Sequence, residues 1–419
     1  MTLQVKGFHS KEAVGAVFKG IVILEGKRTP FGKFMGSLSS VSPTDLGIFA
    51  SKAVIRAAGI DPGEIDQIIV SNIGQASADS FFIARHIGLY SGAPLQAPAV
   101  MAQRICGSGI EIIAQAAEQI AMEKSNLILS CGSDCMSRYP LVSFGARQGF
   151  PLGRPEYLDM LWDALNDTAA VPMGVTADNL AERFSTSREE IDQFAFQSQT
   201  RYQKARLENF FSGEIEPIEG GIFEREGLAA RKFRLNKIKS LEQDEHPREA
   251  TLEKLGQLPF VFSTKGPTTA GSSSGIVDGA ASVLVSSEDF ASTNGIKPIG
   301  RVLAHASVGV EPAIMGIGPV PAVRAVLKSL NMTLEDVDLF EINEAFGAQC
   351  LTVAKELKID LEKLNPNGGA IAIGHPLGAT GLRLVTTLLK SLKARGKTIG
   401  VASACIGGGQ GIAMVVEAL

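Results

Sequence analysis

Two cysteines and one histidine stand in glycine-rich turns, where side chains of these types can do chemistry. Cys106 lies in CGSG at the start of a helical apolar pattern, where free N–H groups and the helix dipole favour a thiolate. His375 lies in AIGHPLGATG and is of the type that most often serves as a general base. Cys405 opens CIGGGQG after the apolar stretch TIGVASA, so its sulfur and nearby N–H groups can face a ligand. A buried structural side chain is the competing interpretation for each.

Asn343 and Glu344 form a polar pair directly after the apolar strand DLFEI. An uncompensated pair at a strand end is suited to hold a water or a carbonyl oxygen, and a helix cap is the alternative. Because strand ends of α/β units converge on one face, we expect this pair, Cys106, His375 and Cys405 to meet at one site.

An internal repeat supplies the elements that position these residues. Residues 53–70 and 325–342 share one pattern of amphipathic helix, acidic turn and apolar strand. The matched pairs are Asp66 with Asp338 and Gly109 with Gly381, each 272 apart (338 − 66 and 381 − 109), and Ser130 with Ser403, 273 apart. A register kept within one residue over this length predicts two copies of one α/β unit.

The stretch between the copies, roughly 136–275, has a different character. It holds the single tryptophan, two charged helical segments near 177–184 and 187–209, and the basic run RKFRLNKIK at 231–239. Ser187 and Glu190 form a capping box at the start of the second segment. We expect an insertion that lies over the duplicated core, with the basic run as a solvated face.

Composition bounds the class of protein. With 419 residues, 45% hydrophobic and 20% charged, the chain is expected to be globular with two or three domains. A net charge of -4 gives no long-range attraction for nucleic acid or an anionic membrane. No apolar run approaches the roughly 18 residues of a membrane span, and residues 1–20 contain no secretory h-region. Five cysteines favour a reducing compartment, the cytoplasm or an organelle matrix.

The chain resembles the thiolases over nearly its full length, from about Ile21 to Leu419. The matching segments are RTPFGKFMGSL, RICGSG, MSR, MGVTADNLAERFSTSREEID, TTAGSSSGIVDGAAS, MGIGPVPA, NEAF, NGGAIAIGHPLGATG and CIGGGQG. NEAF, GHP and CIGGG separate this family from the ketoacyl-carrier-protein synthases, which share the doubled fold but pair their cysteine with two histidines.

The resemblance implies an α/β thiolase fold with two duplicated βαβαβαββ halves in a five-layer αβαβα arrangement. It implies an N-terminal half at 18–135, completed by about 276–297, and a C-terminal half at 298–419. Residues 136–275 would form an inserted loop domain that contacts coenzyme A, and the basic run at 231–239 could alternatively meet its phosphates. By the same analogy we expect a homodimer or homotetramer.

The implied activity is that of a CoA-dependent acyltransferase of fatty acid metabolism, which condenses acyl-CoA or cleaves 3-ketoacyl-CoA. Cys106 would be the acylated nucleophile, His375 its activating base and Cys405 the second acid/base. Asn343, through a water, and His375 would form one oxyanion hole, and the N–H groups of Cys106 and Gly407 the other.

The resemblance also implies four substrate contacts: Ser274 at coenzyme A, and Met173, Met315 and Phe346 along the acyl pocket. CoA and acyl-CoA would be the substrates, with no metal and no permanently bound cofactor required.

Departures from the family pattern leave two activities open, that of an acetyl-CoA acetyltransferase and that of a 3-ketoacyl-CoA thiolase with a broader range of substrates. Pro172 stands where many acetoacetyl-CoA-specific members have histidine, which argues against strict short-chain specificity. Cys131 and Cys135 replace a glycine and a serine, with no further ligands nearby to suggest a metal site. The alternatives are another condensing enzyme of this fold or a non-catalytic lipid-binding relative. A β-oxidation hydratase–dehydrogenase partner subunit stays open.

Overall fold

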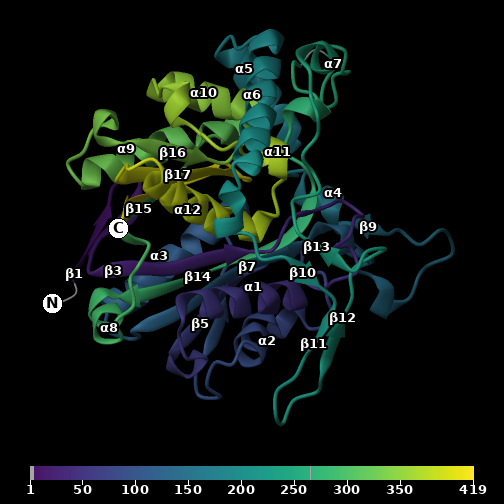
Figure 1. Ribbon diagram of the computed structural model, residues 1–419. Helices are drawn as coiled ribbons and strands as arrows, with labels where there is room; N and C mark the ends of the chain where they lie inside the picture. The colour runs from purple at the N-terminus through teal and green to yellow at the C-terminus, as the bar shows by residue number, and fades with distance from the viewer. Residues whose placement is uncertain (1–3, 265) are drawn as a thin grey trace.

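The main strands are hydrogen-bonded edge to edge along one path, β16-β17-β18-β15-β3-β14-β7-β5-β6. This arrangement is seen in the computed structural model, which describes residues 4–264 and 266–419 (Figure 1). The path is nearly divided at its middle, because β15 and β3 pair only through Gly300–Ile23 and Arg301–Val22. Each side of that junction is one half of the molecule.

The N-terminal half has the order βαβαβαββ that the sequence predicts. Its elements are β3 (Ile21–Arg28), α1 (Pro43–Ala58), β5 (Gln67–Ser71), α2 (Ile83–Tyr90), β6 (Ala99–Met101), α3 (Ser108–Ala121), β7 (Leu127–Cys135) and β14 (Val277–Ser287). The strand β5 runs parallel to β6 and β7, whereas β14 is antiparallel to both β7 and β3. The last strand thus arrives from the far side of the insertion and closes this half.

The C-terminal half repeats this plan with one difference. Its elements are β15 (Gly300–Gly309), α9 (Pro319–Ser329), β16 (Leu339–Ile342), α10 (Gly347–Leu357), α11 (Ala370–Ile373), α12 (Leu377–Ala394), β17 (Ile399–Ile406) and β18 (Gln410–Ala418). In place of a counterpart to β6, a single parallel bridge joins Phe340 to Leu364. The third strand of this half is therefore reduced to one residue pair.

The repeat is visible in equivalent hydrogen bonds. Asp66 Oδ2 accepts the N–H groups of Asn126 and Leu127, and Asp338 Oδ2 accepts those of Thr398 and Ile399. Each aspartate holds the start of the second parallel strand of its half. The two copies of one α/β unit are confirmed by this identical pairing.

The expected shift of the repeat to 273 is wrong. Ile69 pairs with Ser130 in the N-terminal half, and Glu341 pairs with Ala402 in the C-terminal half. Both matches keep the offset of 272 (341 − 69 and 402 − 130), so Ala402 is the counterpart of Ser130. Ser130 and Ser403 are alike in type but do not occupy equivalent positions. The hydrogen-bond register, and not the residue type, decides which residues of the two strands correspond.

Alternation along the strands builds five layers. Successive strand side chains point to opposite faces, so Ile23 and Met414 pack on the central helices α3 and α12. Their neighbours Val22 and Ala413 pack outward, against α1 and α2 on one side and α9 and α10 on the other. Figure 1 shows the resulting helix–sheet–helix–sheet–helix order. The αβαβα arrangement is confirmed.

The central helices α3 and α12 meet at equivalent glycines. A Cβ on Gly109 would lie 2.7 Å from Gly381 Cα, and a Cβ on Gly381 would lie 2.7 Å from Gly109 Cα. Neither position has room for a side chain. The two helices therefore approach backbone to backbone, which brings the turns at their N-terminal ends together.

The region between β7 and β14 covers both halves. Its elements are β8 (Leu141–Val142), β9 (Leu158–Asp159), α4 (Met160–Ala164), α5 (Met173–Arg183), α6 (Arg188–Leu207), β10 (Ile218–Glu219), β11 (Gly221–Phe223), β12 (Arg231–Phe233), β13 (Ser240–Leu241) and α7 (Leu252–Gly256). The helices α5 and α6 pack on α10 and α11, while Ile218 and Phe233 join the N-terminal core. The predicted capping box of Ser187 and Glu190 is confirmed at the start of α6.

A hairpin precedes the duplicated core. Its strands β1 (Gln4–His9) and β2 (Val14–Lys19) pair with each other, and β2 adds to the free edge of β15. Phe18 of β2 stacks on His305 of β15 with ring centroids 5.8 Å apart. The hairpin thus covers an edge that would otherwise expose unpaired backbone groups. Two short elements complete the chain: β4 (Gly32–Lys33), beside β14, and α8 (Glu288–Thr293).

Candidate active site

Cys106 lies in a tight turn between β6 and α3. Residues 105–107 form one turn of 3-10 helix, and α3 continues from Ser108. Ile105 has φ of 42°, a left-handed conformation that costs a β-branched residue about 1–3 kcal/mol. The Ser108 hydroxyl donates to the Ile105 carbonyl oxygen and accepts the Arg104 N–H, each at 2.7 Å. The strained turn is thus held by its own hydrogen bonds, with the thiol at its apex.

The thiol of Cys106 is the neutral form at rest. Burial raises its pKa to about 11, although the backbone N–H groups of Gly407 and of Cys106 itself point at the sulfur and lower it. The raising effect of burial is larger than the lowering effect of the two N–H groups, so the net shift opposes the thiolate that the helix start favours. The two N–H groups thus converge on the Cys106 sulfur.

His375 is buried in the turn that precedes α12. Its backbone N–H donates to the Gly275 carbonyl oxygen at 3.0 Å, and its Nδ1 lies 2.5 Å from Thr380 Oγ1. The Thr380 hydroxyl donates to the Pro376 carbonyl oxygen at 3.0 Å, so the threonine oxygen accepts the hydrogen bond that the N–H group at Nδ1 donates. Burial lowers the pKa of His375 to about 3, with further repulsion from Arg383. The imidazole is therefore neutral and carries its lone pair on Nε2.

Asn343 faces that lone pair. Its Nδ2 lies 3.2 Å from His375 Nε2, and its backbone N–H donates to the Ser403 carbonyl oxygen at 2.9 Å. The amide oxygen Oδ1 is buried without a hydrogen-bond partner. A buried acceptor of this kind calls for a donor such as a water, which in turn can donate to a substrate oxygen.

Glu344 is fully occupied by the fold. Its carboxylate accepts the Ser198 hydroxyl at 2.6 Å, the Asn365 side-chain amide at 2.9 Å and the Ile371 N–H at 3.1 Å. The expectation of an uncompensated Asn–Glu pair is thus wrong for the glutamate. The helix-cap alternative is wrong as well, because α10 begins after Phe346.

Cys405 lies at the end of β17, with its side chain fully buried. Burial raises the pKa of its thiol, and the nearby charge of Cys106 raises it further, so the two sulfurs are electrostatic neighbours. After Gly407, the chain reverses through Gly408 and Gly409, which have φ of 82° and 84°. Only glycine adopts this conformation without strain, and the turn aims the Gly407 N–H at Cys106.

The predicted acyl-pocket residues lie together around Cys405. Met315, Phe346 and Cys405 belong to one buried cluster, with Met173 and Phe262 packed against it. The Met173 methyl group lies 2.3 Å from where a Cβ on Gly407 would be. This apolar cluster therefore adjoins the turn that faces the Cys106 sulfur.

The Cys106 side of the site is apolar too. Cys106 forms a cluster with Met136 and Leu377, and Leu377 follows His375 by two residues. Ser274 is half-buried, and its N–H donates to the Ala345 carbonyl oxygen at 3.0 Å, which places it beside the NEAF segment. The structure thus brings the sequence-predicted residues of both halves to one region.

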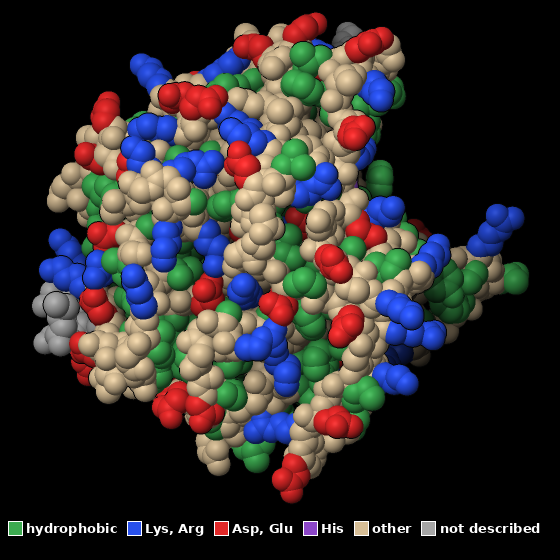
Figure 2. Space-filling view, viewed as in Figure 1, with side chains coloured by type: hydrophobic (Ala, Val, Ile, Leu, Met, Phe, Trp, Pro, Cys, Tyr) green, Lys and Arg blue, Asp and Glu red, His purple; other side chains and the backbone are tan. Residues whose placement is uncertain are grey.

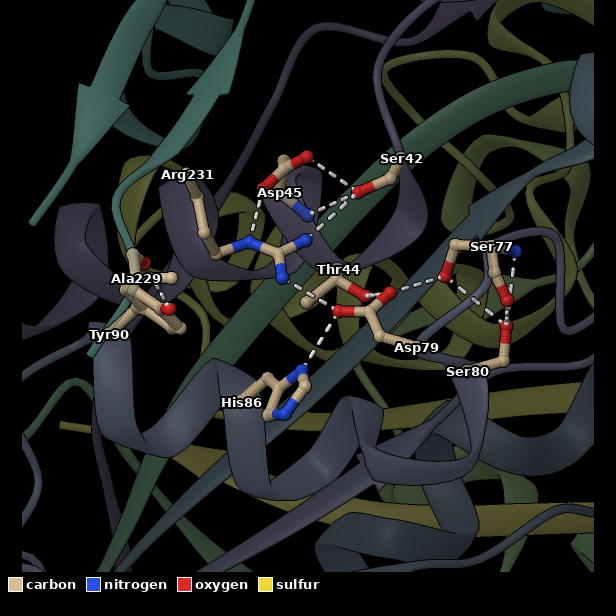
Figure 3. Close-up of polar contacts among 10 residues, drawn as sticks. All are labelled: Ser42, Thr44, Asp45, Ser77, Asp79, Ser80, His86, Tyr90, Ala229 and Arg231. Atoms are coloured by element: carbon tan, nitrogen blue, oxygen red, sulfur yellow. Dashed lines mark hydrogen bonds and ion pairs between the residues drawn. The ribbon is translucent and has the colours of Figure 1, made fainter.

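The basic run lies elsewhere. Lys232, Arg234, Lys237 and Lys239 are exposed and Phe233 is buried, as a solvated face requires. Arg231 is the exception, since it donates to Asp45 and Asp79 at 2.7 Å each (Figure 3). Asp79 also accepts from Thr44 and lies 2.8 Å from His86 Nδ1. This arginine holds the insertion to the N-terminal half, and its charge is already paired with two carboxylates.

Three cysteines and one histidine prove to be packing residues. The thiols of Cys131 and Cys135 donate to the carbonyl oxygens of Gly47 and Leu38, away from Cys106. Cys350 is buried within α10. His246 lies against Gly275, and burial lowers its pKa to about 4. All five cysteines are free.

Sequence reasoning missed three residues of this site. Thr380 fixes the His375 tautomer, Ile105 carries the backbone strain beside Cys106, and Asp134 accepts the Gly378 N–H at 2.6 Å. A carboxylate inside the apolar strand LILSCGSDC is a usable signal, because a buried charge demands partners. Nothing in the sequence marks the other two.

Comparison with known proteins identifies relatives along the whole chain. Residues 21–289 match the thiolase N-terminal domain, and residues 296–418 match the thiolase C-terminal domain. The mitochondrial 3-ketoacyl-CoA thiolase of Bos taurus is 41% identical over 405 residues, 96% of this chain and 99% of that protein. The β-ketoadipyl-CoA thiolase of Acinetobacter baylyi is 39% identical over 411 residues, 95% and 99% of the two chains. The crystal structure of human mitochondrial 3-ketoacyl-CoA thiolase in complex with CoA has a TM-score of 0.90 at 40% identity, covering 96% and 98%.

Proposed function

The chain belongs to the thiolase family and is a CoA-dependent thiolase, and we propose that Cys106 carries the acyl group through its reaction. The observation that carries this proposal is the convergence of the Cys106 and Gly407 N–H groups on the Cys106 sulfur. A carbonyl carbon bonded to that sulfur would have its oxygen beside two fixed donors. The neutral His375 of the His375–Asn343 pair supplies the base at Nε2, and that nitrogen becomes a hydrogen-bond donor to a second oxyanion once it is protonated.

In cleavage, the Cys106 proton moves to His375 Nε2 as the sulfur attacks the 3-keto carbon of the substrate. The thiol has a raised pKa and the imidazole a lowered one, so the ion pair is not formed in advance. The proton therefore moves with the attack, when the new oxyanion is stabilised. The C2–C3 bond then breaks, and its electron pair forms the enolate of acetyl-CoA.

Cys405 completes this half-reaction by giving its proton to C2 of the enolate. Acetyl-CoA leaves, and an acyl thioester remains on Cys106. The thiol of free CoA then attacks that thioester and loses its proton to the Cys405 thiolate. The new acyl-CoA departs, and Cys106 takes back the proton held by His375. Condensation is the same sequence in reverse.

Two oxyanion holes divide the work. The N–H groups of Cys106 and Gly407 serve the oxygen of the thioester formed at Cys106. His375, with a water held by the free Oδ1 of Asn343, serves the enolate oxygen. Separate sites are required because the two charges develop on different oxygens, the 3-keto oxygen and the thioester oxygen of the 3-ketoacyl-CoA.

We propose a 3-ketoacyl-CoA substrate with an acyl chain longer than acetoacetyl. The relatives are named 3-ketoacyl-CoA and β-ketoadipyl-CoA thiolases. An apolar wall is available in Met173, Met315 and Phe346. Pro172 stands before this wall, at the position where many acetoacetyl-CoA-specific members have histidine. The steady-state kcat/KM for cleavage should therefore rise from C4 to longer 3-ketoacyl-CoA. A sharp maximum at acetoacetyl-CoA would contradict this choice.

We propose that coenzyme A lies against the inserted region, residues 136–275, which includes Ser274. The N-terminal half, completed by residues 276–297, and the C-terminal half, from residue 298, would flank this position. Ser274 is half-buried with its backbone tied to Ala345, so its hydroxyl is free to meet the pantetheine arm. The substitution Ser274→Ala should raise KM for CoA a few-fold and leave kcat unchanged, because one hydrogen bond to CoA, worth about 1 kcal/mol, is lost.

A homodimer or homotetramer is proposed from two exposed apolar regions. The strand β6 is a free sheet edge, with Val100 43% exposed, and Phe81, which precedes α2, is 82% exposed. The loop between β8 and β9 protrudes at the side of the molecule and shows hydrophobic side chains (Figures 1 and 2). Among them Phe144 is 80% exposed. Such patches usually mark interfaces, and sedimentation velocity would give the mass.

The proposed compartment is reducing, either the cytoplasm or an organelle matrix. All five thiols are free, and the relative from Bos taurus is mitochondrial. Within residues 4–264 and 266–419, none of the helices has the length and apolarity needed to cross a bilayer.

Mass spectrometry of the intact protein tests the central role of Cys106. Incubation with acetyl-CoA should add one acetyl group, mapped to Cys106 by peptide digestion and absent from Cys106→Ala. Acetylation of another residue, or none in an active preparation, would refute the acyl-enzyme. A non-catalytic relative or another condensing enzyme would show no CoA-dependent cleavage of 3-ketoacyl-CoA.

A further inference from the structure

Asp134 is a buried carboxylate that none of these steps uses. It is the next-to-last residue of β7, and its side chain is fully buried. A charged group in such a place is costly unless hydrogen bonds compensate it. Its counterpart in the C-terminal half, at the offset of 272, is Ile406 (406 − 134). The carboxylate is therefore not part of the duplicated framework.

The carboxylate joins three separate segments. Oδ2 accepts the Gly378 N–H at 2.6 Å, from the first turn of α12. Oδ1 accepts from the loop after β5 and from the segment after β7. These donors are Asn72 Nδ2 at 3.1 Å, Ile73 N at 3.0 Å, Gly74 N at 3.2 Å and the Tyr139 hydroxyl at 3.1 Å.

Gly378 is held from its other side as well. The Ser71 hydroxyl donates to its carbonyl oxygen at 2.8 Å. Gly132 of β7 has no room for a side chain, because a Cβ there would lie 2.0 Å from the same oxygen. Both contacts come from the N-terminal half, so the start of α12 is clamped onto the ends of β5 and β7.

This clamp acts on the turn that carries His375. Gly378 follows His375 by three residues, and Thr380, which holds Nδ1, follows by five. A displacement of Gly378 would move both ends of the hydrogen-bond chain that orients the imidazole. Misplacement of a catalytic base by about 1 Å can cost 10²-fold in rate.

We propose that Asp134 is a positioning residue, which fixes the His375 turn of one half against the ends of β5 and β7 in the half that carries Cys106. This inference rests on the proposed roles of Cys106 and His375. It assigns to the N-terminal half the task of aligning the base that the C-terminal half provides.

The carboxylate also has an electrostatic effect on the site. The titratable groups around it are Cys106, Tyr139 and Cys135, and its charge raises the pKa of each. Burial raises the pKa of Asp134 to about 6, against its N–H donors, so the group is charged at neutral pH and above. A structural carboxylate remote from Cys106 would leave the titration of that thiol unmoved.

The test is Asp134→Asn in the full-length protein. The amide keeps the volume but turns one acceptor into a donor, which faces the Gly378 N–H or the loop N–H groups. We expect kcat for 3-ketoacyl-CoA cleavage to fall at least about tenfold, with KM changed less than about threefold. The rate of Cys106 alkylation by iodoacetamide should rise at fixed pH, because a negative charge near the thiol is lost.

Asp278→Asn is the matched control. Asp278 is also a fully buried carboxylate whose pKa burial raises to about 6. It accepts from the Ser137 N–H and hydroxyl at 2.8 and 2.7 Å, and Ser137 follows β7, outside the His375 turn. This variant should lose stability to a similar extent, yet keep kcat and the alkylation profile.

Identical behaviour of the two variants in kcat and alkylation would overturn the proposal. Should Asp134→Asn not fold, Asp134→Glu carries the test, because it keeps the charge and shifts the oxygens by one methylene. It should lower kcat about tenfold with the alkylation profile unchanged, and an unchanged kcat would sink the idea. If Cys106→Ala still becomes acylated, the proposed function fails instead, whatever Asp134 does.

Discussion

The two halves share one framework but differ where chemistry is proposed. In the N-terminal half, the β5–β6 pair Ile68–Ala99 lies seven residues before Cys106 (106 − 99). In the C-terminal half, the equivalent pair Phe340–Leu364 lies fourteen residues before Gly378, the counterpart of Cys106 (378 − 364). The additional residues form α11 and the turn that holds His375.

This difference shows how a duplicated unit acquires two roles. The N-terminal copy keeps a short connection, which ends in a strained turn with Cys106, the proposed nucleophile, at its tip. The C-terminal copy shortens its edge strand to one bridge, and the longer connection carries His375, the proposed base. Residues equivalent to Asn343 and Cys405 are Ser71 and Ser133 (343 − 272 and 405 − 272), which bond only backbone carbonyls. The framework is symmetric, whereas the polar atoms around it are not.

The largest expected effect is at Cys106. Replacement Cys106→Ala should lower kcat for cleavage at least about 10⁴-fold, because the covalent route is lost. Cys131→Ala removes a buried thiol of the same half and should keep kcat within about threefold. Steady-state assays of CoA-dependent cleavage make the comparison. Equal losses would mean that burial alone, rather than nucleophilicity, sets the requirement for cysteine.

Cys405→Ala should cost about 10³-fold in turnover, as expected for a lost acid/base group. A single turnover should still acylate Cys106 from acyl-CoA, although more slowly, as seen by mass spectrometry, because Cys106 forms the thioester bond and Cys405 only donates a proton to the departing CoA thiolate. Ser133→Ala at the matching position removes one hydrogen bond to Pro43, worth about 1 kcal/mol of stability. Failure of the Cys405 variant to acylate would assign both steps to one machinery.

Asn343→Ala should lower kcat roughly 10²-fold by removing the holder of the oxyanion-hole water. Ser71→Ala loses a single bond to the Gly378 carbonyl oxygen, so about 1 kcal/mol or fivefold is the expected limit. The measurement is kcat with saturating CoA. If the serine variant were the worse of the two, clamping of the turn would matter more than the water.

The protonation of the nucleophile gives a pH prediction. The folded-state pKa of Cys106 is raised to about 11, so the thiol is neutral below that value. Its alkylation by iodoacetamide should therefore accelerate about tenfold per pH unit from pH 7 to 10, as thiolate fraction grows. A plateau beginning below pH 7 would instead indicate a resting thiolate–imidazolium pair, which the neutral His375 excludes.

The smallest effects test the symmetric part of the halves. Asp66→Ala and Asp338→Ala each remove two bonds to strand N–H groups, so each should lower stability by about 1 kcal/mol. The thermal unfolding midpoints should fall by similar amounts, with activity retained. A marked difference would show that one copy of this junction is reinforced by its surroundings.

Much of the fold could be predicted because it depends on patterns within short stretches of the sequence. Helical and strand periodicity, the Ser187 capping box and the repeated aspartates identify the α/β unit and its copy. The reduced third strand could not be predicted, since residues 361–366 lack a strand pattern and the Phe340–Leu364 bridge is a long-range contact. The one-residue error in the repeat had the same origin, because register is a property of paired strands.

The candidate site divides in the same way. Residue type and turn chemistry marked Cys106, His375, Cys405 and Asn343 from the sequence. Thr380 was invisible, because a threonine on a helix becomes a hydrogen-bond partner only when an imidazole lies over it. Glu344 was misread, because its three partners come from α6, α11 and a distant loop.

By itself, the sequence determined which residues stand at turns, which faces of helices and strands are apolar, and that one unit occurs twice. These properties depend on neighbours a few residues away, so they are readable without the fold. Tertiary structure alone decided the protonation of Cys106 and His375, the free acceptor of Asn343 and the clamping of Gly378 by Asp134. Solvation and hydrogen-bond satisfaction are set by everything that packs around a group, and here that surrounding comes from both halves.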